Sequence, residues 1–407
     1  MNNIEIIKDS KFKGIYLSIN FLLPIDAERI ANNLVWATSL SKVNSKYKTQ
    51  RELELKLAEL YNSTYGVGVE KIGDLYNIEF KLECLNSKNL PNEEKIFNKV
   101  IEVFTTLLLK PKIKDNKFDD KVIERQKQYF INILDKQKEN TRSYANNKLI
   151  QLLEKGQLSE VNIYTDKETI EKVTAESAYK SYLELLEEAE IKIVLTGNIE
   201  DYMVESVKEK LPQSNKKYEL NKPVKITPKK NIGGDKVSLS QSVLGIGFQI
   251  ENYDIKDAYK YMVINHILGQ GSNSKFFLSV REKHSMAYYI FSSFKRIKGE
   301  IVLLTGISNN NKDKVEELVY EQILELSKGK VTDTEINVSK TALIASVDEL
   351  NEYTSVLAKK SLYNNLIYGR YIPANEMIKE INSVTKKDIV NLTKLIKVKA
   401  IYFYEGE

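Results

Sequence analysis

The alternation of apolar and polar positions predicts a chain that mixes strands with long helices. The apolar run Ile15–Leu23 is typical of a buried strand, and the helical periodicity of Asp26–Ser41 follows it directly. Two further strand-like runs, Tyr65–Lys71 and Leu75–Leu85, flank the turn Gly73-Asp74 and predict a hairpin. The first part of the chain therefore combines helices and strands within one domain.

Helix start signals define the other elements of this part. Thr49 and Glu52 form a capping box, in which each side chain satisfies an N–H group at the start of a helix that runs to about Tyr61. Pro91 suits the first turn of a helix that we expect to reach Leu109. The remaining predicted elements are helices over Asp115–Leu153 and Ala175–Glu187 and a strand over Ile191–Leu195.

A change of composition divides the chain. Residues 212–236 are rich in Lys, Pro, Asn and Gly and show little apolar periodicity. Such a segment is typical of a linker between domains. We therefore predict one domain over residues 1–211 and a second over residues 237–407.

The second part repeats the order of elements in the first. Its predicted elements are a strand at Val243–Ile250, a helix at Ile255–Leu268, a turn at Gly299-Glu300 and a capping box at Thr332–Glu335. Phe248 matches Phe21 at an offset of 227 residues (248 − 21), and the closing strand from Val398 matches that from Ile191 at an offset of 207 (398 − 191). We predict an α+β fold of two similar lobes made by internal duplication, each a mostly antiparallel sheet packed with helices.

Composition narrows the classes of function. Of the 407 residues, 42% are apolar, which argues against disorder, and the net charge of +5 is not gathered into a basic face that would bind nucleic acid. The single cysteine, Cys84, excludes a disulfide within the chain and suits a reducing compartment. Neither a signal-peptide pattern nor an apolar run of the ~20 residues of a membrane span is present. We expect a cytoplasmic protein that binds neither nucleic acid nor membrane.

The segment Asn265–Ser308 closely resembles the C-terminal lobe of the pitrilysin/insulinase/mitochondrial-processing-peptidase family. That family has a helix ending LGGG-x-SS-x-LF, then VREKxGLAY, then strands. The matching residues are Leu268-Gly269, Gly271-Ser272, Ser274, Phe276-Phe277, Val280–Lys283 and Ala287-Tyr288. The resemblance implies two lobes in a clamshell arrangement and, in active relatives, zinc-dependent hydrolysis of peptide bonds.

The zinc motif of that family is missing from this chain. Active relatives carry H-x-x-E-H in the N-terminal lobe, where two imidazoles and a distant Glu hold zinc and the Glu of the motif takes a proton from water. The corresponding helix segment, Ala31–Thr38, has no His, Cys or acidic residue, and the two histidines, His266 and His284, lie in the other half. We expect no metal site in this chain. Glu124 falls near the place of the distant Glu, but we expect it on a solvated helix face.

Two residues match the family's pair in the C-terminal lobe. The resemblance makes Arg281 and Tyr288 the Arg–Tyr pair that binds the substrate backbone and stabilises the oxyanion in active relatives. A guanidinium and a phenol O–H can both donate to developing negative charge. The alternative is that Arg281 is a surface ion-pair partner and Tyr288 a packed strand residue.

The resemblance implies a function in a two-chain peptidase. Some bacterial members pair a zinc-bearing chain with a non-catalytic chain that supplies the Arg–Tyr pair, and this sequence is similar to the second kind. Zinc is then expected in the partner chain, and the substrate is a peptide or unfolded polypeptide. The sequence is also similar to the zinc-less member of tandem-encoded pairs associated with elongation factor P modification.

Two other functions stay open. The chain could be a stand-alone peptide-binding or scaffold protein, with a homodimer as its isolated state. It could also be an enzyme with carboxylate chemistry, although no spaced pair of acidic residues differs from a solvated helix face.

The remaining candidate residues have simpler interpretations. By resemblance, the strand of Tyr65, Val67 and Val69 is the edge strand that pairs with an extended peptide. Trp36 is expected in a core, His266 in a half-buried helix position and His284 at an exposed helix end. The glycines of Gly269–Ser274 follow a helix and lack the strand that precedes a phosphate-binding loop.

Overall fold

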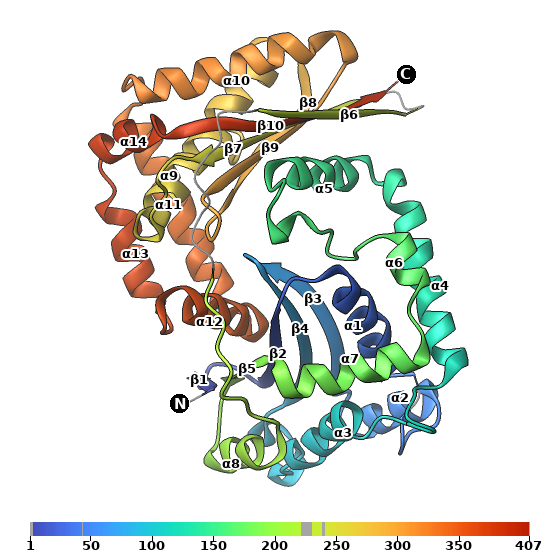
Figure 1. Ribbon diagram of the computed structural model, residues 1–407. Helices are drawn as coiled ribbons and strands as arrows, with labels where there is room; N and C mark the ends of the chain where they lie inside the picture. The colour runs from blue at the N-terminus through green and yellow to red at the C-terminus, as the bar shows by residue number, and fades with distance from the viewer. Residues whose placement is uncertain (1–2, 43, 221–229, 238–240, 407) are drawn as a thin grey trace. The chain divides into compact units, whose positions relative to one another are not determined.

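Two five-stranded sheets organise the computed structural model, which describes residues 3–42, 44–220, 230–237 and 241–406 (Figure 1). Each sheet belongs to one of two compact units. The first unit comprises Met1–Asp135, Val161–Leu220 and Asn351–Tyr371, and the second comprises Lys136–Glu160, Asn221–Leu350 and Ile372–Glu407. Among the described residues, no helix has both the length and the apolar character needed to cross a membrane.

The N-terminal sheet has the strand order β1-β5-β2-β4-β3. Its strands are β1 (Ile4–Lys8), β2 (Gly14–Pro24), β3 (Thr64–Ile72), β4 (Leu75–Leu85) and β5 (Glu190–Gly197). β1 pairs in parallel with β5, and every other pairing is antiparallel. The four predicted strands of this half are confirmed, β1 was not predicted, and β3 lies at an edge.

One face of this sheet holds the main core of the first unit. The alternate residues Ile15, Leu17, Ile19 and Phe21 of β2 are all buried in that core, as the period of two in a strand requires. Helices of this unit are α1 (Ala27–Ser39), α2 (Gln50–Glu59), α3 (Phe97–Leu109), α4 (Asp120–Lys136), α6 (Lys167–Glu171), α7 (Ala175–Glu188) and α8 (Asp201–Lys210). Trp36 on α1 is fully buried, which confirms its predicted place in the core.

The C-terminal sheet repeats the topology of the first. Its order is β6-β10-β7-β9-β8, with β6 parallel to β10 and the other pairings antiparallel. Its strands are β6 (Asn231–Val237), β7 (Ser242–Ile250), β8 (Ala287–Lys295), β9 (Glu300–Ile307) and β10 (Ile396–Gly406). The identical order of equivalent strands confirms the predicted α+β fold of two similar lobes.

The predicted linker contains a strand. β6 lies almost wholly within residues 212–236, so the linker prediction was wrong for this part, and residues 221–229 lie outside the described residues. β6 carries Gly233-Gly234 and is an edge strand held by its pairing with β10. Backbone pairing at an edge needs no apolar alternation, so hydrophobic periodicity could not reveal it.

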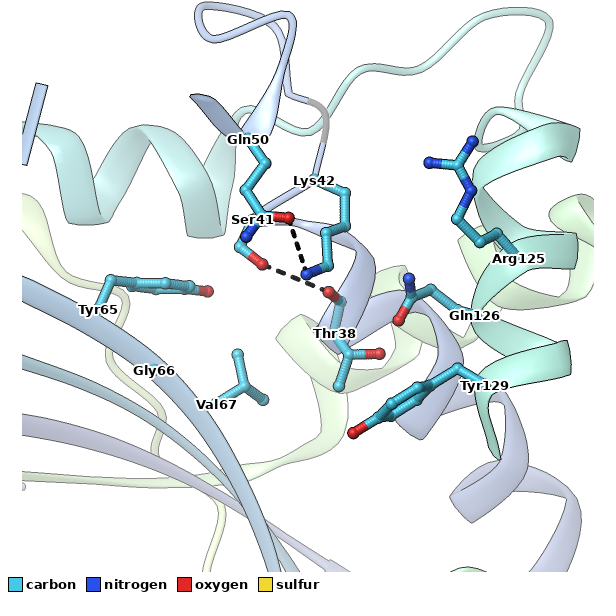
Figure 2. Close-up of a pocket in the computed structure, with 10 residues that line it drawn as sticks. All are labelled: Thr38, Ser41, Lys42, Gln50, Tyr65, Gly66, Val67, Arg125, Gln126 and Tyr129. Carbon is cyan, nitrogen blue, oxygen red and sulfur yellow. Dashed lines mark hydrogen bonds between the residues drawn. The ribbon is translucent and has the colours of Figure 1, made fainter. Parts of the chain in front are cut away.

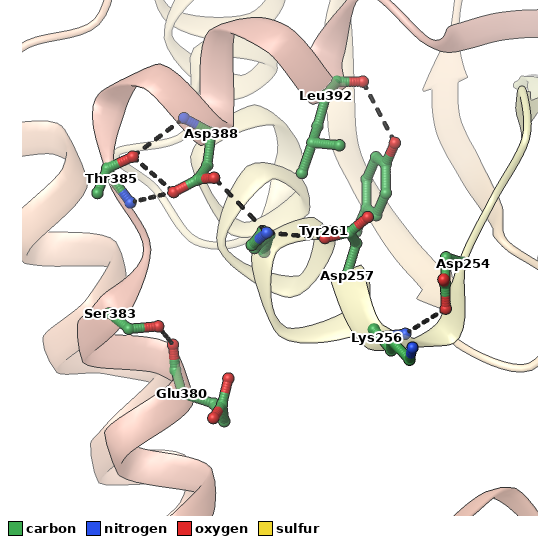
Figure 3. Close-up of polar contacts among 10 residues, drawn as sticks. Asp254, Lys256, Asp257, Tyr261, Glu380, Ser383, Thr385, Asp388 and Leu392 are labelled. Atoms are coloured by element: carbon green, nitrogen blue, oxygen red, sulfur yellow. Dashed lines mark hydrogen bonds and ion pairs between the residues drawn. The ribbon is translucent and has the colours of Figure 1, made fainter.

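Ion pairs and caps join the helices of the second unit (Figure 3). These helices are α9 (Ala258–Gly269), α10 (Lys312–Ser327), α11 (Asp333–Leu350), α13 (Ala374–Ser383) and α14 (Lys386–Thr393). The Lys260 ammonium lies 2.8 Å from Asp257 and 3.6 Å from Asp388, so it links α9 to the first turn of α14. Asp388 also accepts a 2.9 Å hydrogen bond from the Thr385 backbone N–H, which completes a capping box.

Each sheet has a second face, and a helix from the other half of the sequence covers it. α5 (Thr141–Leu153) lies against β7 and β10 of the C-terminal sheet (Figure 1). Its Leu149 and Leu153 approach so closely that a Cβ atom on Gly245 would lie 2.9 Å from Leu149 and one on Gly247 would lie 3.1 Å from Leu153. A larger residue at either glycine would therefore require these leucine side chains to shift where the helix crosses the sheet.

The reciprocal helix comes from the C-terminal half. α12 (Thr354–Tyr368) packs on β2 and β5, where Ala358 is buried with Tyr16 and Val194. The Thr196 hydroxyl donates to the Thr354 carbonyl at 3.0 Å. α12 follows α11 as α5 follows α4, so the duplicated halves exchange equivalent helices. The predicted boundaries therefore separate the two sheets, apart from β6, but do not place these two helices.

Two helix predictions need correction. The stretch Asp115–Leu153 is not continuous, because α4 ends at Lys136 and Asn140 caps α5 by accepting a 3.1 Å hydrogen bond from the Ser143 N–H. An Asn at the N-cap marks the start of a new helix. It does so even where the helical spacing of apolar residues continues through that position. Pro91 opens only the short 3₁₀ turn Pro91–Glu93, and α3 begins at Phe97.

Replacing Leu149 tests the exchanged helix. Leu149 is fully buried against the C-terminal sheet, so Leu149→Ala should lower the free energy of unfolding by about 2–5 kcal/mol through a cavity. Leu158, which is 51% exposed, serves as the control, because Leu158→Ala should change stability by no more than about 0.5 kcal/mol. Urea denaturation measures both, and equal stabilities would contradict the packing.

The contacts of Asp388 predict a dependence of stability on pH. Burial favours its neutral form, but hydrogen bonds from Thr385 and the charge of Lys260 outweigh burial and hold its pKa below the ordinary value of 3.8. A lowered pKa in the folded state stabilises the protein above the unfolded-state pKa, and this stabilisation is lost as the pH falls through the folded-state pKa.

We therefore expect Asp388→Ala to lower the free energy of unfolding by about 1 kcal/mol at pH 7 and by clearly less near pH 3. Denaturation at both pH values measures the difference. Asp313→Ala is the control, since that side chain is 97% exposed in the first turn of α10. A deficit for Asp388→Ala that stays constant with pH would contradict the ion pair.

Candidate functional site

A pocket of about 480 Å³ lies in the first unit between α1, α2, β3 and α4 (Figure 2). The end of α1 and the start of α2 contribute Thr38, Ser41, Lys42 and Gln50. The edge strand β3 and the helix α4 contribute Tyr65, Gly66, Val67, Arg125, Gln126 and Tyr129. The pocket therefore adjoins the helix on which active relatives would carry the metal motif, as the resemblance implies, and the predicted peptide-edge strand.

The chemistry of this pocket does not suit a metal ion. Its described lining has two cations, two phenols, hydroxyls and amides but no carboxylate, imidazole or thiol, which are the side chains that bind zinc. The Lys42 ammonium donates to the Gln50 amide oxygen at 3.1 Å, and the Thr38 hydroxyl donates to the Leu34 carbonyl at 2.8 Å. Across the described residues, no three His, Cys, Asp or Glu side chains are grouped so that they could hold a metal ion.

The helix α1 uses its inner face for packing. Trp36 stacks on Phe80 and Phe118 at centroid distances of 6.1 and 6.4 Å and donates to the Asn33 amide oxygen at 2.7 Å. Glu124 on α4 is 57% exposed and pairs with Lys127 at 3.2 Å, as the prediction of a solvated helix face requires. Trp36 therefore belongs to the core and Glu124 to the surface, and neither forms part of a metal site.

The predicted peptide-edge residues lie on a true sheet edge. β3 pairs only with β4 among the described strands, so the backbone groups on its other side have no strand partner there. Tyr65, Val67 and Val69 point toward the core of the first unit, since alternate strand residues share a face. The Tyr65 hydroxyl is buried without a hydrogen-bond partner in the described chain, and burial raises the pKa of this phenol, which keeps it a donor at neutral pH.

Arg281 lies in the π-helical segment Phe277–Lys283 of the second unit. Its guanidinium stacks over the Phe277 ring, 4.8 Å from the centroid, and the side chain is exposed. Within the described residues, it has no ion pair. Segments of π-helix are rare and frequently found at functional sites. The alternative of a surface ion-pair partner therefore does not describe Arg281.

Tyr288 lies at a β-bulge on the edge strand β8. The pairing of β8 with β9 shifts between Ala287 and Tyr289, which leaves Tyr288 as the extra residue. A bulge re-aims a side chain, and that of Tyr288 is 62% exposed, with no hydrogen bond in the described structure. The alternative of a packed strand residue is thus wrong for Tyr288. Both members of the predicted pair present unused donors to solvent.

The histidines and the glycine loop have structural roles. His284 is half-buried rather than exposed, because its Nδ1–H donates to the Ser279 carbonyl at 2.8 Å. His266 is half-buried as predicted, and burial lowers its pKa. Gly269 ends α9, and a Cβ atom there would collide with Ser292 of β8, so this glycine serves the packing of helix on sheet.

The comparisons with known proteins agree with this geometry. Residues 172–343 match the family described as Peptidase M16 inactive domain. The chain is 24% identical to the probable inactive metalloprotease YmfF of Bacillus subtilis (strain 168), over 99% of this chain and 95% of that protein. The chain is therefore similar to proteins of the peptidase M16 family, and the resemblance drawn from the sequence is confirmed.

Solved structures share the fold of this chain. A conserved protein from Enterococcus faecalis V583 superposes with a TM-score of 0.91 at 24% identity, over 99% of this chain and 96% of the other. The peptidase M16 inactive domain from Pseudomonas fluorescens superposes with a TM-score of 0.80 at 17% identity, over the same shares of the two chains. The two-lobed fold shared with these structures therefore extends through nearly the whole chain.

Sequence reasoning missed most residues of the pocket as site residues, among them Lys42, Arg125 and Gln126. One signal was available for Arg125: no acidic residue lies three or four positions from it on α4, where an ion-pair partner would face it. The approach of α4 to β3 and α1 is a tertiary contact, so no local pattern could group these residues.

The lining of the pocket predicts that the isolated chain retains no zinc. After dialysis against buffered zinc and gel filtration, elemental analysis by mass spectrometry should find far less than one zinc ion per chain, because the site offers cations where ligands are needed. A zinc-bearing M16 chain with H-x-x-E-H serves as the positive control. Stoichiometric zinc in this chain would contradict the prediction.

Proposed function

We propose that this chain is the non-catalytic subunit of a two-chain M16 peptidase. It would bind the peptide substrate, help to enclose it and supply Arg281 and Tyr288 to the zinc site of a homologous partner. The observation that carries the proposal is that both side chains are exposed donors without partners among the described residues, in a chain of the inactive M16 kind.

The chemistry of the two donors supports a role at a developing oxyanion. A guanidinium stays charged at all physiological pH values, and a phenol donates one O–H. Their positions are built by backbone devices, a π-helical segment for Arg281 and a β-bulge for Tyr288, so neither depends on a flexible loop tip. Preorganised donors of this kind stabilise a transition state because they need not reorient during the reaction.

The edge strand β3 supports peptide binding by strand addition. An extended peptide gains main-chain hydrogen bonds by pairing with an exposed edge, and pockets beside the edge select its side chains or ends. The residues Tyr65, Val67 and Val69 lie on that edge, and the pocket opens beside the first two. Peptide binding would therefore use the N-terminal unit, with Arg281 and Tyr288 in the C-terminal unit.

Removing the guanidinium tests the proposal. Mixed with a zinc-bearing M16 partner, the Arg281→Ala chain should co-purify as the wild type does but lower peptide turnover by about 100-fold, the usual effect of losing one oxyanion donor. Lys283→Ala is the matched control, because it removes an exposed cation from the same helical turn. Failure to co-purify, or a turnover unchanged by adding the wild-type chain, would overturn the two-chain function.

A second function is favoured by the location of β3 and the pocket. Both belong to the N-terminal unit and need no partner chain, so the protein could bind peptides alone without cutting them. A stable homodimer that binds peptides and ignores zinc-bearing M16 chains would favour this function. For either function we place the protein in the cytoplasm, since its one cysteine, Cys84, is buried and free.

A further inference from the structure

The pocket beside β3 has the charge of an anion site. Lys42 and Arg125 both line it, and neither has a carboxylate partner among the described residues. The nearest acidic residue in sequence, Glu124, is engaged by Lys127 at 3.2 Å and by the Gln128 amide at 2.9 Å. Two cations without a counter-charge at one cavity favour a ligand that brings a negative charge.

Two further donors in this pocket lack partners. Gln126 is only 6% exposed, and its amide points into the space between α1, β3 and α4 (Figure 2) without a hydrogen bond inside the described chain. The buried hydroxyl of Tyr65 is directed into the same space and is likewise unpaired. A buried polar group without a partner costs free energy, so such groups point to a ligand that satisfies them.

The position of the pocket along β3 determines which end of a paired peptide would reach it. β3 runs from Thr64 to Ile72, and its residues at the pocket are Tyr65, Gly66 and Val67, which lie at its start. A strand added antiparallel to β3 would end beside that start. Antiparallel pairing is also how β3 meets β4 in this sheet. The C-terminal end of an added peptide would therefore arrive at the pocket.

We propose that this pocket binds the α-carboxylate at the C-terminus of an extended peptide paired antiparallel with β3. Lys42 and Arg125 neutralise the carboxylate, and Gln126 and Tyr65 donate hydrogen bonds to it. The inference rests on the proposed function, since it requires peptide binding at β3. It adds a substrate class: short peptides whose free C-terminus reaches the end of the strand, in preference to internal segments of a long chain.

The experiment compares peptides that differ only at this end. A pool of random, N-acetylated decapeptides without Asp or Glu is prepared as free acids and as C-terminal amides, mixed in equal amounts, and passed over the immobilised full-length protein. Mass spectrometry of the retained peptides should show the acids enriched about tenfold over the amides, the gain of a charge-assisted contact. Lys42→Met and Arg125→Met should each reduce that enrichment toward parity.

The control is Lys121→Met, which removes an exposed cation one turn earlier on α4 and should keep the full enrichment. Circular dichroism of each variant checks that it is folded. Retention of acids and amides in equal amounts by the wild type would overturn the carboxylate site but leave peptide binding at β3 intact. Retention of neither form would overturn both this inference and the peptide-binding function.

Discussion

The need to cover both faces of two sheets is the constraint on which the rest of the structure depends. β2 is buried along nearly its whole length, and β7 along all of it, so each central strand must be covered on both sides. One face of each sheet is covered by helices of its own half. The second face is covered by α5 or α12, which comes from the other half. Neither half of the duplication can therefore bury its sheet with its own residues alone, and the chain folds as two mutually dependent units.

The same strand order places equivalent strands at one edge of each sheet. In both sheets the first strand of a hairpin, β3 before β4 or β8 before β9, lies at the outside, and these strands carry the features of functional interest. β3 adjoins the pocket, and β8 carries the bulge at Tyr288. The two equivalent edges differ, because β8 has a bulge and β3 pairs regularly with β4. An unpaired edge is a liability for aggregation unless it has a use, which agrees with pairing to a peptide.

The N-terminal unit has a cavity whose described lining offers no metal ligands. Hydroxyls, amides, Lys42 and Arg125 line it. A site for a divalent cation requires negative or neutral donors, whereas this lining attracts anions. The lining therefore suits the proposed carboxylate ligand better than a zinc ion.

The sequence by itself determined the buried strands, the duplication, the absence of the H-x-x-E-H motif and the match of Arg281 and Tyr288 to a family motif. Each of these follows from a pattern of residues along the sequence, namely periodicity, repeated spacing or a short motif. Only the tertiary structure decided the edge strand β6, the exchange of α5 and α12, and the grouping of Lys42, Arg125 and Gln126 in one pocket. An edge strand is held by backbone pairing, which carries no side-chain pattern. Equally, the apolar stripe of α5 predicts burial but not which sheet buries it, because burial of apolar surface is non-directional.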